Sequence, residues 1–154
     1  MSEPDRPDVI APPPLIYAGA LAIGLLLQLL WPLGTHDAPG IRLVGVLLGA
    51  LGFAFSVSGV RELRRWGTNV DPRRPATALV RTGPYRYSRN PAYTGLTGLY
   101  VGIALAVNSL WLILMLAPTL VAMSRGVIER EERYMERKFG EQYLDYKRSV
   151  RRWI

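Results

Sequence analysis

The 154-residue sequence contains no cysteine and only one histidine. The missing cysteine excludes disulfides, thiolate metal sites and cysteine nucleophiles, and a single histidine cannot build a zinc site alone. The sequence also lacks the alternating strand and helix patterns, with a glycine-rich first turn, that a Rossmann-type fold requires. We therefore expect an all-α protein that binds no metal.

Charge is missing from three long tracts, although the chain as a whole carries a formal net charge of +7. A membrane crossing needs about 20 mainly apolar residues, and the third tract is too long for one crossing unless it turns at Asn108-Ser109. The acidic leader MSEPDRPD and the lack of a clear cleavage site argue against a secretory signal. The tracts, Ala11–Thr35, Leu43–Val60 and Pro91–Ser124, thus predict a single-domain bundle with four spans at about 13–33, 42–60, 92–107 and 110–124.

The basic residues fall in two clusters, with eight arginines from Arg61 to Arg89 and nine Lys or Arg from Arg125 onward. Four crossings place both clusters and both termini in the cytoplasm, as the positive-inside rule prefers. We expect a multi-pass protein of a bacterial inner membrane whose arginines contact anionic membrane lipids rather than nucleic acid. A cytoplasmic loop over 61–91 follows, and His36 is expected in an ordinary external loop.

The last cluster has the pattern of an amphipathic helix over 126–150. Apolar residues such as Phe139, Tyr143 and Tyr146 share one stripe, yet Glu132 falls inside that stripe and Glu131 lies beside it. A buried carboxylate requires a partner. Two interpretations stay open, a salt bridge to an arginine of the 61–89 segment or a contact with a hydroxyl-rich or cationic ligand.

The segment GPYRYSRNPAYTG, residues 83–95, leads into the third tract. Asn90 is a good N-cap and Pro91 is favoured at the first helical position, so a helix should begin here with free N–H groups that suit an anion. The tyrosines of the segment offer flat faces for a ring. Such a site would suit a zwitterionic nucleoside such as S-adenosylmethionine. The pairs Gly45/Gly49 and Gly98/Gly102 more often mark helix contacts than ligand sites.

Two motifs carry a family resemblance: LVRTGPYRYSRNPAYTG and, after the hydrophobic hairpin, EERYMERKFGEQYLDY. Together they resemble the membrane methyltransferases of the isoprenylcysteine carboxyl methyltransferase and phospholipid methyltransferase group, over about Thr77–Trp153. The resemblance implies an S-adenosylmethionine site built from the loop, the helix start and the acidic pair. The implied cofactor residues are Thr77, Ala78, Leu79, Val80, Tyr85, Asn90, Pro91, Ala92, Tyr93, Glu131 and Glu132.

The chain departs from the carboxyl methyltransferases at two positions. Asn90 stands where those enzymes have His in Arg-His-Pro, and Val127 replaces a substrate-binding arginine, which leaves Arg89 and Arg125 as candidates for binding the acceptor. No general base is identified. The resemblance implies methylation of a lipophilic acceptor, preferably the carboxylate of an isoprenylcysteine-like or prenyl compound. An amino-lipid N-methyltransferase is the alternative, and a non-catalytic membrane docking protein is a further one.

Overall fold

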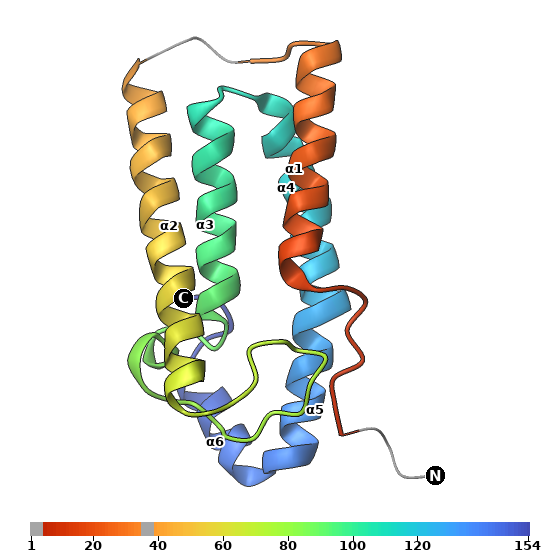
Figure 1. The fold of residues 1–154 in the computed structure, drawn as a ribbon, viewed down its shortest axis with the longest axis vertical. Coiled ribbons are helices and arrows are strands. Elements are labelled where there is room, and N and C mark those ends of the chain that lie inside the picture. The colour runs from red at the N-terminus through yellow and green to blue at the C-terminus, as the bar shows by residue number, and fades with distance from the viewer. Residues whose placement is uncertain (1–4, 35–38) are drawn as a thin grey trace.

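The computed structural model describes residues 5–34 and 39–154 and is helical, without a strand among those residues (Figure 1). Four helices run side by side: α1 (Pro13–Leu30), α2 (Pro39–Arg65), α3 (Pro91–Ala106) and α4 (Leu110–Met123). The expected all-α bundle is confirmed. His36 lies outside the described residues.

Three of the described helical stretches are long and apolar enough to cross a bilayer, namely Pro13–Leu30, Pro39–Arg65 and the continuous stretch Leu110–Phe139. Many of their apolar side chains, such as Leu29 and Leu51, are exposed, as expected for a surface that faces lipid. The structure is that of a helical membrane protein. With 16 residues, α3 rises only about 24 Å at ~1.5 Å per residue, so a fourth crossing stays a prediction.

Glycine allows α2 and α3 to pack backbone against backbone. A Cβ added at Gly52 would lie 2.5 Å from the backbone nitrogen of Leu99, and one at Gly45 would lie 2.6 Å from that of Ala106. At Gly102 an added Cβ would overlap the backbone of Gly49. Small residues permit this close approach in membranes. The expectation that these glycines mark a helix contact is therefore confirmed.

The turn between α3 and α4 lies at the predicted Asn108-Ser109. Asn108 has a positive φ of 53°, a conformation that Asn tolerates better than most residues. Ser109 precedes α4, and its hydroxyl accepts a hydrogen bond from the backbone N–H of Leu112 at 3.4 Å. This cap starts α4 at Leu110, as predicted.

Two predicted boundaries are wrong in the segments beyond α2 and α4. The loop expected from residue 61 starts later, because α2 continues to Arg65 and then stops at Gly67, whose φ is 65°. The backbone N–H groups of Gly67 and Thr68 bond to the carbonyls of Arg64 and Leu63, which is the Schellman arrangement for ending a helix. The extra turn carries Leu63, which packs against the buried cluster that contains Val80 and Tyr85.

The helix expected over 126–150 is also wrong, because it is two helices with a sharp break between them. A π-helical turn, η2 (Ser124–Ile128), joins α4 to α5 (Glu129–Phe139) without interruption. Gly140, with a φ of 53°, then separates α5 from α6 (Glu141–Ser149). Only glycine adopts this conformation without strain. As a result, α6 folds back toward the short 3-10 helix η1 (Gly83–Arg86).

Candidate functional site

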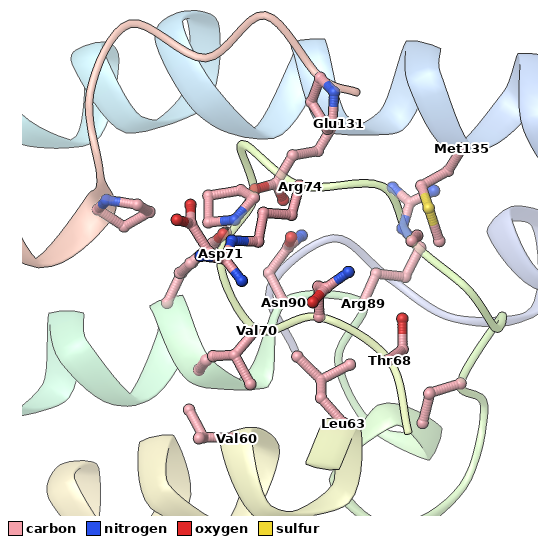
Figure 2. A pocket seen from close by; sticks show the side chains of 18 of the residues that line it. Val60, Leu63, Thr68, Val70, Asp71, Arg74, Arg89, Asn90, Glu131 and Met135 are labelled. Carbon is pink, nitrogen blue, oxygen red and sulfur yellow. Dashed lines mark hydrogen bonds between the residues drawn. The ribbon is translucent and has the colours of Figure 1, made fainter. Parts of the chain in front are cut away.

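A cavity of about 550 Å³ lies where the bundle meets the segments beyond the ends of α2 and α4 (Figure 2). Its walls come from several parts of the chain: Pro7 with the first residues of α1, the end of α2, the loop 68–80, η1, the start of α3, α5 and α6. The volume suits a drug-sized or cofactor-sized ligand, for which sites of roughly 300–1,000 Å³ are usual. Chain segments distant in sequence thus share one chamber.

Most of the residues predicted for the site line this cavity. They are Ala78, Leu79, Val80, Tyr85, Arg89, Asn90, Ala92, Tyr93, Glu131 and Glu132. The structure therefore brings the two motifs of the sequence together, although they are separated by the α3–α4 hairpin. Their roles toward a ligand remain predictions.

Three predicted residues do not line the cavity. Thr77 holds the loop instead, since its backbone N–H donates to the Thr68 hydroxyl at 3.0 Å and its hydroxyl donates to a backbone carbonyl at 3.0 Å. Pro91 is buried against Gly59 of α2. Arg125 is exposed on η2. Thr77 and Pro91 therefore shape the local backbone, and Arg125 is not part of the cavity wall.

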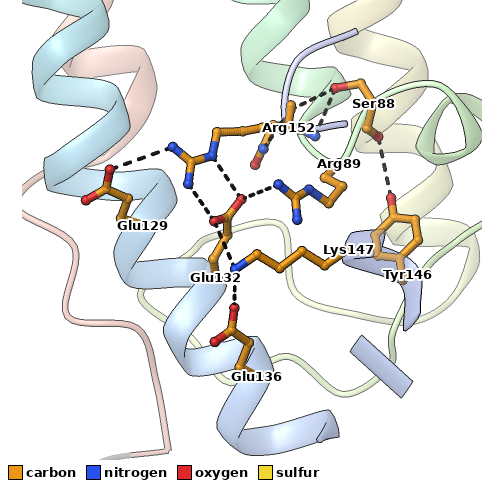
Figure 3. A network of polar contacts seen from close by, with 9 residues as sticks. Ser88, Arg89, Glu129, Glu132, Glu136, Tyr146, Lys147 and Arg152 are labelled. Carbon is orange, nitrogen blue, oxygen red and sulfur yellow. Dashed lines mark hydrogen bonds and ion pairs between the residues drawn. The ribbon is translucent and has the colours of Figure 1, made fainter. Parts of the chain in front are cut away.

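Glu132 lies at the centre of an ion-pair network (Figure 3). Its Oε1 lies 3.1 Å from Arg89 Nη2, and Arg152 donates to both carboxylate oxygens at 3.1 and 2.8 Å. Lys147 Nζ approaches to 4.0 Å. The side chains of Glu132 and Arg89 are only 6% and 8% exposed. The salt-bridge interpretation of Glu132 is thus confirmed, with Arg89 as its partner from the 61–89 segment.

Arg89 retains unused hydrogen-bonding capacity inside the cavity wall. Its Nη2 pairs with Glu132, but its Nε and Nη1 are buried and have no hydrogen-bond partner among the described residues. A buried charged donor without an acceptor is costly, so such groups in native proteins usually have a partner. Arg89 lines the cavity, so an anionic group that reached one of these donors would give it an acceptor.

Glu131 differs from its neighbour because no described Lys or Arg pairs with it. Tyr93 donates its hydroxyl to Glu131 Oε1 at 2.6 Å. Glu131 lies outside the predicted membrane span, seven residues beyond Ser124 at the end of the uncharged tract. Burial raises the pKa of Glu131 to about 7, while the Tyr93 hydrogen bond lowers it and the charge of Glu132 raises it further. This carboxyl group is free to neutralise a cationic ligand.

The start of α3 is held by the C-terminal residues rather than by the predicted cap. The Asn90 side chain makes no capping bond, and its Nδ2 donates to the Arg152 carbonyl at 3.0 Å. The backbone N–H of Arg89 donates to the Arg151 carbonyl at 2.9 Å, and that of Asn90 to the Ser88 hydroxyl at 3.0 Å. The prediction that the Asn90 side chain caps the helix is therefore wrong, although α3 begins at Pro91 as predicted.

Tyrosines of α6 hold η1 from the other side. Tyr146 donates its hydroxyl to the Tyr85 carbonyl at 2.7 Å, and both rings pack with Val80 and Tyr143. Burial raises the pKa of Tyr85 and of Tyr146, so both phenols stay neutral at physiological pH. The flat faces expected near a ring-binding site are therefore partly used in packing.

A family model described as phospholipid methyltransferase matches residues 41–142, which are 102 of the 154 residues. The chain belongs to the phospholipid methyltransferase family. Family membership indicates a methyltransferase, and the apolar helices indicate a membrane protein. The matched range runs from the start of α2 to the first residues of α6 and contains most of the cavity wall.

One curated protein is similar over a short segment. An uncharacterized protein of Haemophilus influenzae is 46% identical over 35 residues, which are 23% of this chain and 56% of that protein. The alignment thus spans just over half of that relative's length. No solved structure matches the chain.

Two parts of this candidate site lie outside the family match and were missed in the sequence. Arg152 was missed because the amphipathic pattern was extended through residue 150, whereas Val150 is already extended at φ −126° and ψ 135°. Pro7 was missed because it stands in the acidic leader, and Pro12–Pro14 were missed because they stand at the start of the first uncharged tract. The buried position predicted for Glu132 was the available signal, because it required cationic partners from somewhere in the chain.

Proposed function

We propose that this membrane methyltransferase uses S-adenosylmethionine and methylates the carboxylate of a lipophilic acceptor, such as an isoprenylcysteine-like or prenyl compound. The choice of a carboxylate acceptor rests on Arg89, because two buried donors of its guanidinium have no partner among the described residues. Both are charge-assisted donors, which form strong hydrogen bonds to carboxylates. Because Nε and Nη1 point in different directions and Nη2 is paired with Glu132, an acceptor carboxylate would satisfy one of them.

The residues in the cavity fit this cofactor. Glu131 has no described cationic partner and can accept the ammonium of the methionyl part, and the start of α3 at Ala92 and Tyr93 lines the same chamber. When bound, the cofactor supplies a sulfonium methyl group, whose transfer to a carboxylate oxygen forms an ester and leaves a thioether without moving a proton. The chain therefore needs to orient the acceptor and exclude water, and it needs no general base.

The membrane-side wall of the cavity suits a lipophilic acceptor. Ser56 and Val60 of α2 and Leu96 of α3 line this part of the chamber. These side chains lie on helices that are expected to enter the bilayer. The apolar part of an acceptor would contact them while its carboxylate lies at Arg89.

An amino-lipid N-methyltransferase is the second candidate, because the family model that matches is that of phospholipid methyltransferases. An ammonium acceptor must lose a proton before it can attack a methyl group. Glu131, whose pKa is about 7, is the carboxyl group suited to take that proton. On this alternative Arg89 would hold the phosphate of the lipid.

We also propose the topology in which α3 is the fourth crossing and both termini face the cytoplasm of a bacterium. Support comes from the basic residues, which gather beyond the ends of α2 and α4 on the side of the cavity. The positive-inside rule then makes this side cytoplasmic. The cavity would face the compartment that supplies the cofactor.

Methyl transfer and cofactor binding test the proposal together. Purified protein in lipid nanodiscs would be assayed for S-adenosylhomocysteine binding by calorimetry and for transfer to prenyl carboxylates and to amino lipids. Arg89→Lys is expected to raise the KM for a carboxylate acceptor at least tenfold and to leave cofactor affinity within about threefold. Arg125→Gln is the matched control, since Arg125 is exposed and outside the cavity.

Each other outcome has a defined meaning. If Arg89→Lys weakens S-adenosylhomocysteine tenfold, Arg89 binds the cofactor's own carboxylate. Transfer to amino lipids but not to carboxylates establishes the N-methyltransferase. If the folded wild type does not bind the cofactor at millimolar concentration, the proposal is refuted and the interpretation as a non-catalytic membrane docking protein remains.

A further inference from the structure

The residues before α1 form an extended segment, Asp5–Pro12, that we name the N-terminal strap. In Figure 1 the strap runs beside the lower half of the continuous helix formed by α4, η2 and α5. The backbone N–H of Ile10 donates to the Gly126 carbonyl at 3.1 Å. Arg130 donates to the Asp8 carbonyl at 2.6 Å, and Lys138 donates to Asp5 Oδ1 at 2.7 Å.

The contacts of the strap follow one face of the helix. Its partners Gly126, Arg130, Tyr134 and Lys138 are spaced by four residues, and positions four apart lie above one another on a helix. Higher residue numbers on the helix pair with lower residue numbers on the strap, from Ile10 with Gly126 to Asp5 with Lys138. The two segments therefore run antiparallel. A regular series of this kind indicates a docked segment rather than a chance contact.

Gly126 allows the strap to pack closely against the helix. A Cβ added at this glycine would overlap the side chain of Ile10. The absence of a side chain at position 126 therefore leaves the place that Ile10 occupies. Packing at Gly126 fixes the upper end of the strap, and the polar contacts of Asp5 fix the lower end.

Tyr134 connects the strap to the loop over the cavity. Its hydroxyl accepts a hydrogen bond from the backbone N–H of Ala76 at 3.1 Å and donates one to Asp5 Oδ1 at 3.0 Å. Tyr134, Ala76 and Pro7 all line the cavity. One phenol group thus joins three walls, which are α5, the loop and the strap.

The strap is held by contacts of unequal strength. Asp8 is 95% exposed and its pairing with Arg130 is weakened by solvent. Pro7 is buried, and the strap also contains Pro12, so few of its conformations need to be suppressed when it docks. Weak polar contacts at a preorganised segment are suited to repeated opening and closing.

We infer that the N-terminal strap is a movable wall that retains the ligand in the cavity, and that Tyr134 is the positioning residue that closes it against the loop. The identity of the ligand as the cofactor rests on the proposed function. The inference about the wall itself does not, because it concerns access to the cavity. Release of the strap is expected to open the chamber beside α5, and docking of the strap is expected to slow exchange.

The absence of cysteine allows a test that requires no cofactor. A single thiol at Ala92→Cys, which lines the cavity, would be labelled with a maleimide, and hydrogen exchange would report on residues 5–12. Adding Tyr134→Phe should speed labelling at least threefold and raise exchange in the strap. Tyr87→Phe is the matched control, since Tyr87 is 71% exposed. Asp5→Ala, which leaves the Ala76 contact intact, should act in the same direction.

A reversible lock provides the second measurement. Ile10→Cys with Gly126→Cys, in a chain without the labelling cysteine, should form a disulfide because a Cβ at position 126 would contact the side chain at position 10. Oxidation should slow dissociation of S-adenosylhomocysteine at least tenfold, and reduction should restore the rate. If Tyr134→Phe frees the strap in exchange but labelling stays at the wild-type rate, the wall is not a gate. If the wild type binds no cofactor while labelling responds as expected, the proposed function fails and the movable wall stands.

Discussion

Replacing the adjacent carboxylates Glu131 and Glu132 by alanine should separate ligand binding from stability. Glu132→Ala removes the acceptor that compensates Arg89, whose side chain is 8% exposed. Removing one partner of a buried ion pair costs about 3–5 kcal/mol. The other main partner, Arg152, is 32% exposed and can turn to solvent. We therefore take the lower limit, about 3 kcal/mol, as the expected loss in unfolding free energy.

Glu131→Ala should cost much less stability. It removes one hydrogen bond, that from the Tyr93 hydroxyl, which is worth about 1 kcal/mol. No described cation is left without its partner. In a chain of this size about 1 kcal/mol shifts the melting temperature by roughly 2–4 °C. Glu132→Ala should thus lower it by roughly 6–12 °C, and Glu131→Ala by roughly 2–4 °C.

The assay combines thermal unfolding with ligand binding in the same detergent. Tryptophan fluorescence follows unfolding, and calorimetry measures S-adenosylhomocysteine affinity below the melting temperature. Glu131→Ala should lose binding although it is the more stable variant. A double variant, Arg89→Met with Glu132→Leu, removes both charges and should be more stable than Glu132→Ala. Equal destabilisation by the two alanine variants, or a double variant as unstable as Glu132→Ala, would refute the reasoning.

Three further predictions concern pH, packing and topology. Because the pKa of Glu131 is raised to about 7, its carboxylate forms as the pH rises through this value. The affinity for S-adenosylhomocysteine should therefore increase from pH 5.5 to 7.5. A Glu131→Gln variant with the same pH profile in calorimetry would contradict this. Gly102→Leu should prevent α2 from packing on α3 and abolish a folded monomer in size-exclusion chromatography, whereas Gly19→Leu, where an added Cβ meets nothing within 4 Å, should fold. In intact cells, an impermeant thiol reagent should label Val107→Cys but not Arg81→Cys, and the reverse pattern would overturn the proposed topology.

The parts of the fold that follow from local rules were predicted correctly. The lengths of uncharged tracts located the four bundle helices, and Asn108-Ser109 located the turn because few residue pairs suit a tight polar reversal. The break at Gly140 was not predicted, since the apolar stripe continues across it in the sequence. A periodic pattern cannot reveal a single residue with positive φ when the two helices on either side both face the same core.

The site was predicted well where a motif exists and poorly where tertiary contacts decide. The loop and the start of α3 reached the cavity as the resemblance implied, and Glu132 was expected to need a partner. Arg152 escaped prediction because it acts from an extended tail, where helical periodicity has no meaning. Tyr134 escaped because a tyrosine beside charged residues gives no sign that its hydroxyl joins distant segments.

The π-helical turn η2 has a mechanical consequence for the glutamates below it. Such a turn contains one residue more than an α-helical turn, and α5 is oriented as if that residue were absent. If η2 relaxed to a regular α-helix, α5 would rotate by about 100° relative to α4. Glu132 would then face away from Arg89. Deleting one residue within 124–128 should therefore preserve the orientation of α5. The same deletion one turn later, within α5, should rotate the residues that follow it.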